Sequence, residues 1–294
     1  NLALKYTPRW MSVLGRWDVL GKLEYQTNRN FNFYFGKGLT EMYNEELFDA
    51  DYYTLEYSLI QAGIGFSREF WKNAEVKALF VGYYNTDQKN ANSIAQDLPN
   101  IRGVESRFNT QVEFTADLDL RDRNDLPRDG YRFYIDSKIG TDVKSEAGSY
   151  LSSSAHIEMF NTFYPFTLGL RAGGSINEGD VPFFFTEYLG RNTYLRGFRQ
   201  NRFFGDKHLF FNSDFRWQIF DRDDTFIPMQ FGVKLFADVG QLYFDNDRDP
   251  SDWFVGYGGG IYLVPYKERL TINLVVGFSE EETGLILFRL GKPF

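Results

Sequence analysis

Apolar and polar side chains alternate along most of this chain. Between Phe108 and Leu120 the even-numbered positions are largely apolar and the odd-numbered positions are polar or charged. The same division recurs at 131–139, 207–220 and 269–278. Successive side chains of a β-strand point to opposite faces, whereas a helix repeats every 3.6 residues. The pattern therefore predicts strands that each carry one apolar and one polar face.

We expect about fourteen such strands and no competing amphipathic helix. Most of them reach the 9–11 residues that a tilted strand needs to cross a membrane. The expected strands lie at about 2–8, 17–26, 30–36, 55–70, 75–85, 108–120, 130–139, 150–163, 166–175, 207–220, 230–244, 252–264, 269–278 and 284–292.

The connections between these strands alternate in length. Short ones carry turn residues, as at 27–29 and 71–73, and long polar ones lie at about 37–53, 86–107, 140–149 and 176–206. Short turns at one end and long loops at the other are typical of an outer-membrane β-barrel. A soluble β-sandwich is the alternative, but charged faces on nearly every strand fit a wet lumen better than a dry core.

Composition supports a barrel and excludes several classes of site. Mean hydropathy is -0.40. The chain has no run of 18 apolar residues that would predict a spanning helix, but a barrel needs no such run. The 31 Phe and 19 Tyr fit strands and interfacial girdles alike. The absence of cysteine excludes thiolate metal sites, thiol nucleophiles and disulfides. The net charge of -8 gives no support for nucleic-acid binding.

The two ends of the chain carry different signals. Asn1–Lys5 lacks the basic and apolar regions of a secretory signal. We therefore expect residues 1–294 to be the barrel domain of a mature or truncated chain, with an N-terminal periplasmic or enzymatic domain outside it. At the other end, Phe288, Leu290 and Phe294 share one face of the last expected strand. This resembles the C-terminal targeting signal of outer-membrane barrels.

Three elements point to a family when they are taken in order, and the first of them has two parts. The sequence 119–122 (Asp-Leu-Arg-Asp) is followed by 127–131 (Pro-Arg-Asp-Gly-Tyr), then by 194–198 (Tyr-Leu-Arg-Gly-Phe) in a long loop, and then by 236–240 (Phe-Ala-Asp-Val-Gly). Together they resemble the BamA/TamA superfamily of outer-membrane insertases and translocases, also called the bacterial surface antigen family. The resemblance covers roughly residues 105–294; the first hundred residues match only as generic barrel strands.

The resemblance implies a transmembrane antiparallel up-and-down β-barrel of about 14–16 strands, with the long loop folded into the lumen. Its Arg196 would anchor the loop by pairing with Asp238 and with Asp214, and Gly197 and Phe198 would pack beside it. Independently, alternation places both aspartates on polar faces. A solvated lumen wall remains the alternative for the aspartates, and a simple turn for Gly197.

Glycines and histidines leave further alternatives open. Gly256, Gly258 and Gly260 share the inward face of one strand, where they either make room for the loop or mark strand bends. His156 follows Ser154 on a polar face, a spacing that is weak support for a nucleophile and its base. We interpret His156 as a lumen-lining residue. The acidic residues Asp245, Asp247, Asp249 and Asp252 could hold calcium, but solvated loop charges are the simpler interpretation.

We therefore expect a non-enzymatic barrel of the bacterial outer membrane that needs no metal or cofactor. It would assemble or export proteins by offering an unpaired strand edge to an incoming strand. Its partners would be membrane lipid and nascent outer-membrane proteins or exported polypeptide, with accessory lipoproteins left open. The alternative is a barrel that anchors or displays a fused enzyme, such as a patatin-like lipase or a phosphoesterase. A passive porin ranks third, because an inserted loop would block its lumen.

Overall fold

The computed structural model describes most of the chain, with gaps at several loops. The described residues are 2–31, 44, 46–47, 51–71, 73–88, 93–94, 101–142, 148–191, 193–222, 228–245, 250–265 and 270–291. No helix within these ranges is long and apolar enough to cross a membrane.

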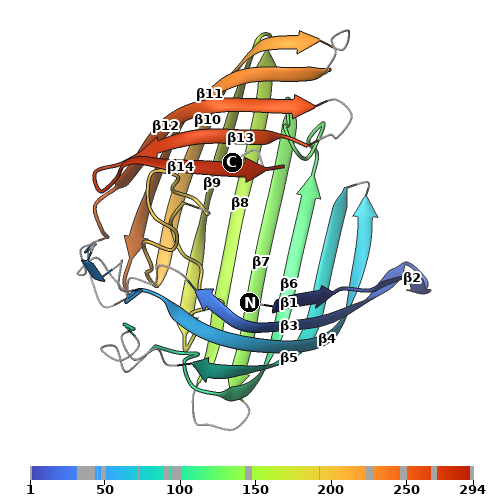
Figure 1. Cartoon of the computed structure of the whole chain (residues 1–294). Helices are drawn as coiled ribbons and strands as arrows, with labels where there is room; N and C mark the ends of the chain where they lie inside the picture. Colours follow the sequence, from blue (N-terminus) through green and yellow to red (C-terminus); the bar gives the residue numbers. More distant parts are fainter. Residues whose placement is uncertain are drawn as a thin grey trace.

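The described residues form an all-β fold (Figure 1). Its strands are β1 (Leu2–Tyr6), β2 (Arg9–Leu14), β3 (Trp17–Phe31), β4 (Leu55–Trp71), β5 (Ala74–Gln88), β6 (Arg107–Asp119), β7 (Gly130–Asp142), β8 (Ser149–Phe163), β9 (Phe166–Gly179), β10 (Lys207–Arg222), β11 (Met229–Tyr243), β12 (Phe254–Pro265), β13 (Ile272–Phe278) and β14 (Thr283–Leu290).

All fourteen strands belong to one antiparallel sheet in which β3 to β13 each pair with the next strand along the chain. A single curling sheet is the up-and-down barrel wall predicted from the sequence, and it excludes a two-sheet sandwich. Figure 1 shows the first and last strands at the two edges of the sheet. Among the described residues, no ladder joins β14 to β1.

The expected number of strands agrees with the structure, but one expected strand is wrong and one observed strand was not expected. The predicted strand at 30–36 is wrong as a separate element, because residues 30 and 31 end β3; residues 32–36 lie outside the described residues. The prediction also missed β2. This strand pairs with β3 beside β1, and its register shifts between Trp10 and Leu14. Ser12 lies there with a φ of 56°, so the alternation of faces is interrupted.

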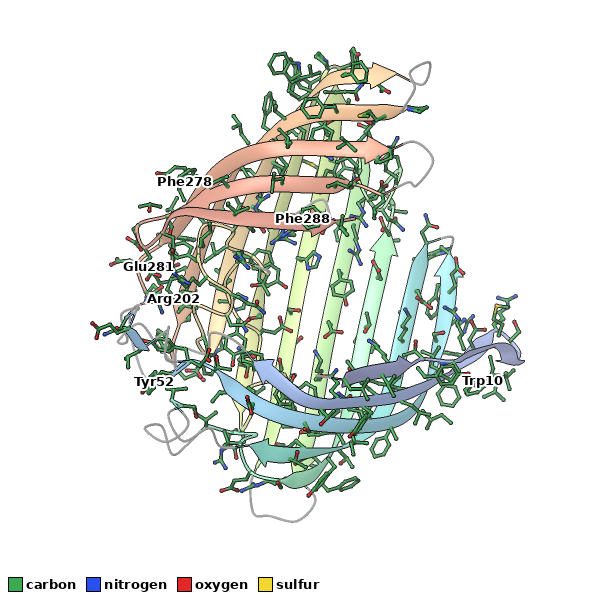
Figure 2. All side chains as sticks on the ribbon, in the orientation of Figure 1. Trp10, Tyr52, Arg202, Phe278, Glu281 and Phe288 are labelled. Carbon is green, nitrogen blue, oxygen red and sulfur yellow. The ribbon has the colours of Figure 1, made fainter. Side chains whose placement is uncertain are left out.

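Alternation along each strand sorts side chains between the outer surface and the lumen. On β10, His208, Asn212 and Asp214 are buried inside, whereas Leu209 and Phe215 are exposed outside. A lipid-facing wall needs apolar side chains, and the lumen can accept polar ones that find partners there. The large exposed apolar side chains therefore form an outer coat over the strands (Figure 2).

The lumen beside β9–β13 is filled by the connection between β9 and β10, residues 180–206, which we call the lumen loop. Its side chains form two apolar clusters with the inner wall. At the other end of the barrel the turn between β6 and β7, residues 120–129, also folds inward. The remaining connections at that end are short, as between β4 and β5 and between β8 and β9.

Candidate functional site

Hydrogen bonds within the lumen loop fold it on itself, apart from its contacts with the barrel wall. Leu189 and Phe203 form an isolated antiparallel bridge, with N···O distances of 2.9 and 3.0 Å. The amide of Leu195 donates to Gly190 O at 3.0 Å, and the Thr193 hydroxyl donates to Tyr188 O at 2.9 Å. The loop is thus a compact unit that presents Arg196 at one turn.

Arg196 meets both aspartates that the sequence placed on polar faces. Its Nε and Nη2 donate to the two oxygens of Asp238 at 2.8 and 2.6 Å. Its Nη1 donates to Asp214 Oδ1 at 2.5 Å, and its backbone amide adds a bond to Asp238 Oδ2 at 2.9 Å. Arg196, Asp214 and Asp238 are 3%, 1% and 0% exposed. We call these three residues the Arg196 clamp; a solvated wall is not what surrounds the aspartates.

The charges of the clamp are balanced by a second cation. Lys234 on β11 donates to Asp214 Oδ2 at 2.9 Å, so two carboxylates face two buried cations. The Arg196 guanidinium also lies 4.1 Å from the centre of the Phe236 ring. Burial alone would lower the pKa of Arg196, but Asp214 and Asp238 outweigh burial and raise it above its ordinary value. The arginine therefore stays charged, and the clamp is an ionic contact.

Gly197 lies where no side chain would fit. A Cβ on this residue would approach Phe278 O to 2.2 Å and the Cα of Gly256 to 2.8 Å. A Cβ added to Gly256 would in turn lie 2.9 Å from Gly197 N. Gly197 lies in a turn closed by the bond from Phe198 N to Leu195 O at 3.3 Å, but its φ is not one that requires glycine. Close backbone approach therefore explains why this turn residue is glycine, and Gly256 makes room for the loop. Gly258 and Gly260 instead face carbonyls of β13, so they serve strand packing.

Phe198 and its neighbours form the apolar part of the anchor. Phe198 is fully buried in a cluster with Leu189, Leu195, Phe203 and Phe254. The rings of Phe203 and Phe254 are stacked with centroids 3.9 Å apart. Burying aromatic side chains in this way contributes more area than the ions do, so the loop is held by packing as well as by charge.

The sequence analysis missed a second set of ionic contacts between the lumen loop and the β13–β14 turn, residues 279–282. Arg202 forms a bidentate pair with Glu281 at 2.7 and 2.8 Å, and Figure 2 labels both residues. Arg199 pairs with Glu282 at 2.5 Å. On β14 itself, Arg289 donates to the carbonyl of Arg191. The sequence signal that could have predicted these pairs is the basic lumen loop together with the three consecutive glutamates at 280–282.

The turn at 120–129 is the second motif that folds into the lumen. Arg121 donates to Glu158 on β8 at 2.8 Å, and Arg128 donates to Gln218 on β10 at 2.9 Å. Leu126 packs in a buried cluster with Tyr262 and Val264 of β12. The turn therefore crosses from β6 and β7 to strands far along the sheet and closes part of that end of the barrel.

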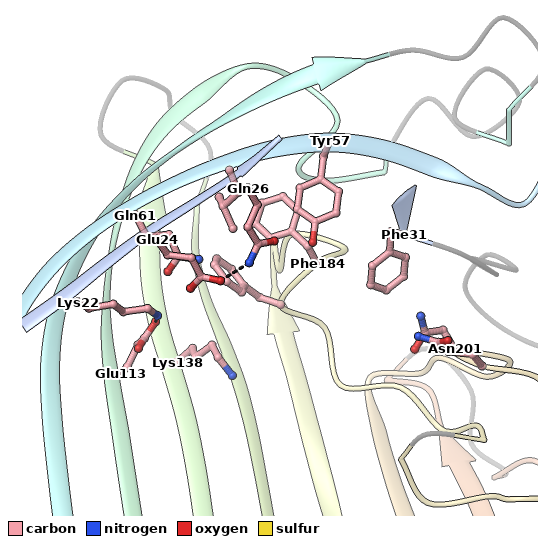
Figure 3. Close-up of a pocket in the computed structure, with 13 residues that line it drawn as sticks. Lys22, Glu24, Gln26, Phe31, Tyr57, Gln61, Glu113, Lys138, Phe184 and Asn201 are labelled. Atoms are coloured by element: carbon pink, nitrogen blue, oxygen red, sulfur yellow. Dashed lines mark hydrogen bonds and ion pairs between the residues drawn. The ribbon is translucent and has the colours of Figure 1, made fainter. Parts of the chain in front are cut away.

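A cavity of about 340 Å³ remains between the lumen loop and the inner wall of β3–β7 (Figure 3). Its charged side chains find partners within the protein: Lys22 pairs with Glu113 at 2.6 Å, and Lys138 with Asp136 at 2.7 Å. Phe184 of the loop and Tyr57 of β4 are stacked at its border. The lumen is thus polar and ionically balanced, as a water-filled barrel interior requires.

The remaining candidates are placed as follows. His156 lines the lumen with Nε2 3.5 Å from Glu158, and no hydrogen bond from Ser154 reaches it among those found in the described residues. No group of acidic or histidine side chains suited to a metal occurs in the described residues; Asp247 and Asp249 lie outside them. Phe288 and Leu290 are exposed on the outer face of β14, and Phe294 lies outside the described residues.

Comparison with known proteins identifies the family of this barrel. The chain resembles the crystal structure of BamA from Haemophilus ducreyi lacking POTRA domains 1–3, with a TM-score of 0.68 and 9% sequence identity. The match covers 98% of this chain and 60% of that one, so the chain spans well under two thirds of the BamA chain. No curated protein matches. The model of the Omp85 superfamily domain matches residues 1–264. The chain therefore belongs to the Omp85 superfamily, and it is a β-barrel of the bacterial outer membrane.

Proposed function

We propose that this barrel inserts proteins into the outer membrane or exports them across it, without covalent chemistry. Insertases and translocases make up the superfamily to which the chain belongs. The observation that carries the proposal is the Arg196 clamp. It holds a 27-residue connection, 180–206, inside the barrel beside the last five strands. A passive porin would need a wide open lumen, which this loop partly fills.

The proposed working part is the unpaired edge of β14. One edge of β14 pairs with β13, from Ile272 opposite Leu290 to Phe278 opposite Thr283. No described strand pairs with its other edge. Such an edge presents free backbone donors and acceptors to an incoming strand, which can pair by β-augmentation. Arg196 would act as the anchor, with Asp238 and Asp214 as its partners. Gly197 and Phe198 would seat the loop, so that the edge strand has a fixed support.

A cysteine-trapping experiment tests this function directly, because the chain has no cysteine of its own. Ile286→Cys places a thiol on the outer face of the edge strand β14. Ile261→Cys is the matched control: it is the same residue type, exposed on the same outer face, but it lies on the interior strand β12. Each variant would be reconstituted in vesicles with an unfolded outer-membrane barrel that carries one cysteine in its last strand.

We expect a disulfide between Ile286→Cys and the substrate barrel, formed while the substrate folds, and none with Ile261→Cys. Equal trapping at both positions would mean nonspecific contact and would contradict the proposal. Absence of trapping together with unassisted substrate folding would favour the alternative, a barrel that anchors or displays a fused enzyme. A lipase or phosphoesterase domain joined to the chain would then carry the activity.

Other predictions from the sequence belong to this proposal. Residues 1–294 would form one barrel domain, with any periplasmic or enzymatic domain outside them. Phe288, Leu290 and Phe294 would serve as the C-terminal targeting signal. Nascent or exported polypeptides would be the substrates, and accessory lipoproteins would be additional partners. The substrates and accessory partners are tested by a pull-down of the membrane-embedded protein under crosslinking, with the Ile261→Cys variant as background.

A further inference from the structure

One arginine lies on the lipid-facing row of β4. Alternation places Ile60, Ala62, Ile64, Phe66, Arg68 and Phe70 on the outer face, and Arg68 is the one charged residue among these six. The row ends at the short turn between β4 and β5. Short turns of outer-membrane barrels face the periplasm, so Arg68 lies near the periplasmic boundary of the membrane. A charge is tolerated there far better than at the membrane midplane.

Two aromatic rings enclose the Arg68 guanidinium. Its Cζ lies 5.4 Å from the centre of the Trp17 ring and 4.8 Å from that of Phe70. The two rings meet edge to face, with centroids 6.5 Å apart. The pairing of Asp18 with Ser67 places Trp17 beside Arg68 across the β3–β4 ladder. The arginine is thus fixed in direction by its neighbours, and its position is built into the strand register.

Arg68 lacks the carboxylate that its neighbours have. Its Nε is buried without a hydrogen-bond partner, and within the described ranges its guanidinium forms no ion pair with an acidic side chain. By contrast, Arg9 on the inner side of the same end pairs with Asp18 at 2.6 Å and with Glu75 at 2.7 Å. A guanidinium offers five donors, and its two terminal Nη groups are not among the buried atoms, so these are the donors that an anion from outside the chain would reach.

We propose that Arg68, Trp17 and Phe70 bind the phosphodiester headgroup of a glycerophospholipid in the periplasm-facing leaflet. A guanidinium matches phosphate oxygens in a bidentate geometry. Aromatic rings at this depth settle between headgroup and acyl chain. The outer-face neighbours Phe66 and Val76 offer apolar surface for the chains of the same lipid. The inference depends on the outer-membrane location and not on insertase activity.

Native mass spectrometry of the folded chain in detergent tests this site. The probes are dioleoylphosphatidylglycerol, dioleoylglycerol with the same acyl chains and no phosphate, and inorganic phosphate. Arg68→Leu removes the charge but suits a lipid-facing position. Lys207→Leu is the control. It removes a cation at the end of the barrel opposite Arg68, where Lys207 at the start of β10 pairs with Asp245 at 3.1 Å. Heat-modifiable gel mobility verifies that each variant is folded.

We expect Arg68→Leu to weaken phosphatidylglycerol binding about tenfold, the loss of a charge-assisted hydrogen bond, while Lys207→Leu leaves it unchanged. Arg68→Lys should recover only part of the binding, because an ammonium lacks the planar fork. Binding that is unchanged in folded Arg68→Leu overturns the proposal. So does equal binding of dioleoylglycerol. Arg68-dependent binding of inorganic phosphate at the same concentration would overturn the lipid as the source.

Discussion

Removal of the Arg196 side chain is the sharpest perturbation of the clamp. Arg196→Ala deletes the two bonds to Asp238 and the one to Asp214. Asp214 keeps Lys234 at 2.9 Å, but Asp238 is left as a fully buried carboxylate without the arginine. Removing one partner of a buried pair costs about 3–5 kcal/mol, most of it the penalty of the stranded charge. We therefore expect a folded but less stable barrel.

A double variant separates the stranded charge from the lost contact. Asp238→Asn in the Arg196→Ala background removes the uncompensated carboxylate while keeping its shape. The double variant should be more stable than Arg196→Ala alone, and the cycle should give a coupling energy of about 2–3 kcal/mol. Asp214→Asn should restore less, because its removal also strands Lys234.

The assay is the temperature at which the folded chain loses its heat-modifiable gel mobility, supported by urea unfolding in detergent micelles. Arg196→Ala should lower the transition temperature, and the double variant should raise it again by part of that change. An unchanged transition in Arg196→Ala would refute the internal clamp. A double variant no more stable than the single one would refute the reasoning that the charge of Asp238 dominates.

Three further perturbations follow from the same contacts. Gly197→Ala should lower the gel transition, because its Cβ would meet Phe278 O at 2.2 Å, whereas Gly148→Ala, with its nearest atom at 3.9 Å, should not. Arg202→Glu alone should lower the resistance of the folded chain to protease. The exchanged double variant, Arg202→Glu with Glu281→Arg, should retain most of it, because the ion pair stabilises the loop whichever residue carries the positive charge. Burial raises the pKa of the Glu187 carboxyl above 4.5, with Lys138 opposing it. An acid with a raised folded pKa stabilises at low pH and loses that stability as pH rises through the folded pKa, so Glu187→Gln should raise the gel transition at pH 7 and leave it unchanged at pH 4.

The strands were predictable because their rule is local. Lipid favours apolar side chains at outward positions, so most strands repeat the same division of faces. The expected strand at 55–70 agrees with β4 to within a residue, and parity alone put Asp238 of β11 inside. The same parity marks Arg68 as an exception on an apolar face. β2 broke the rule, since all its residues are exposed and Ser12 interrupts its register.

Loop contacts could not be predicted in the same way. Arg202 and Glu281 are 79 residues apart, and no periodicity relates a position in one loop to a position in another. The contact of Arg196 with Asp238 was expected from family resemblance, and parity could add only that both aspartates face inward. Gly197 shows the limit most clearly. Its sequence context fits a turn, and only the approach of Phe278 O and Gly256 reveals a packing requirement.

The contacts of the lumen loop differ in kind on its two sides, which bears on where the barrel can change shape. Toward β10–β14 the loop is fixed by buried or half-buried ion pairs such as Arg196–Asp238, in addition to the apolar cluster around Phe198. Toward β3–β5 its contacts are aromatic, as in the stacking of Phe184 on Tyr57 at 5.1 Å. The β10–β14 side therefore carries charge-assisted hydrogen bonds in addition to aromatic packing, and these hold it more strongly. Movement should therefore separate the loop from β3–β5 before it separates the loop from β13–β14. Amide exchange in β4 should then exceed that in β11, and the reverse order would contradict this account.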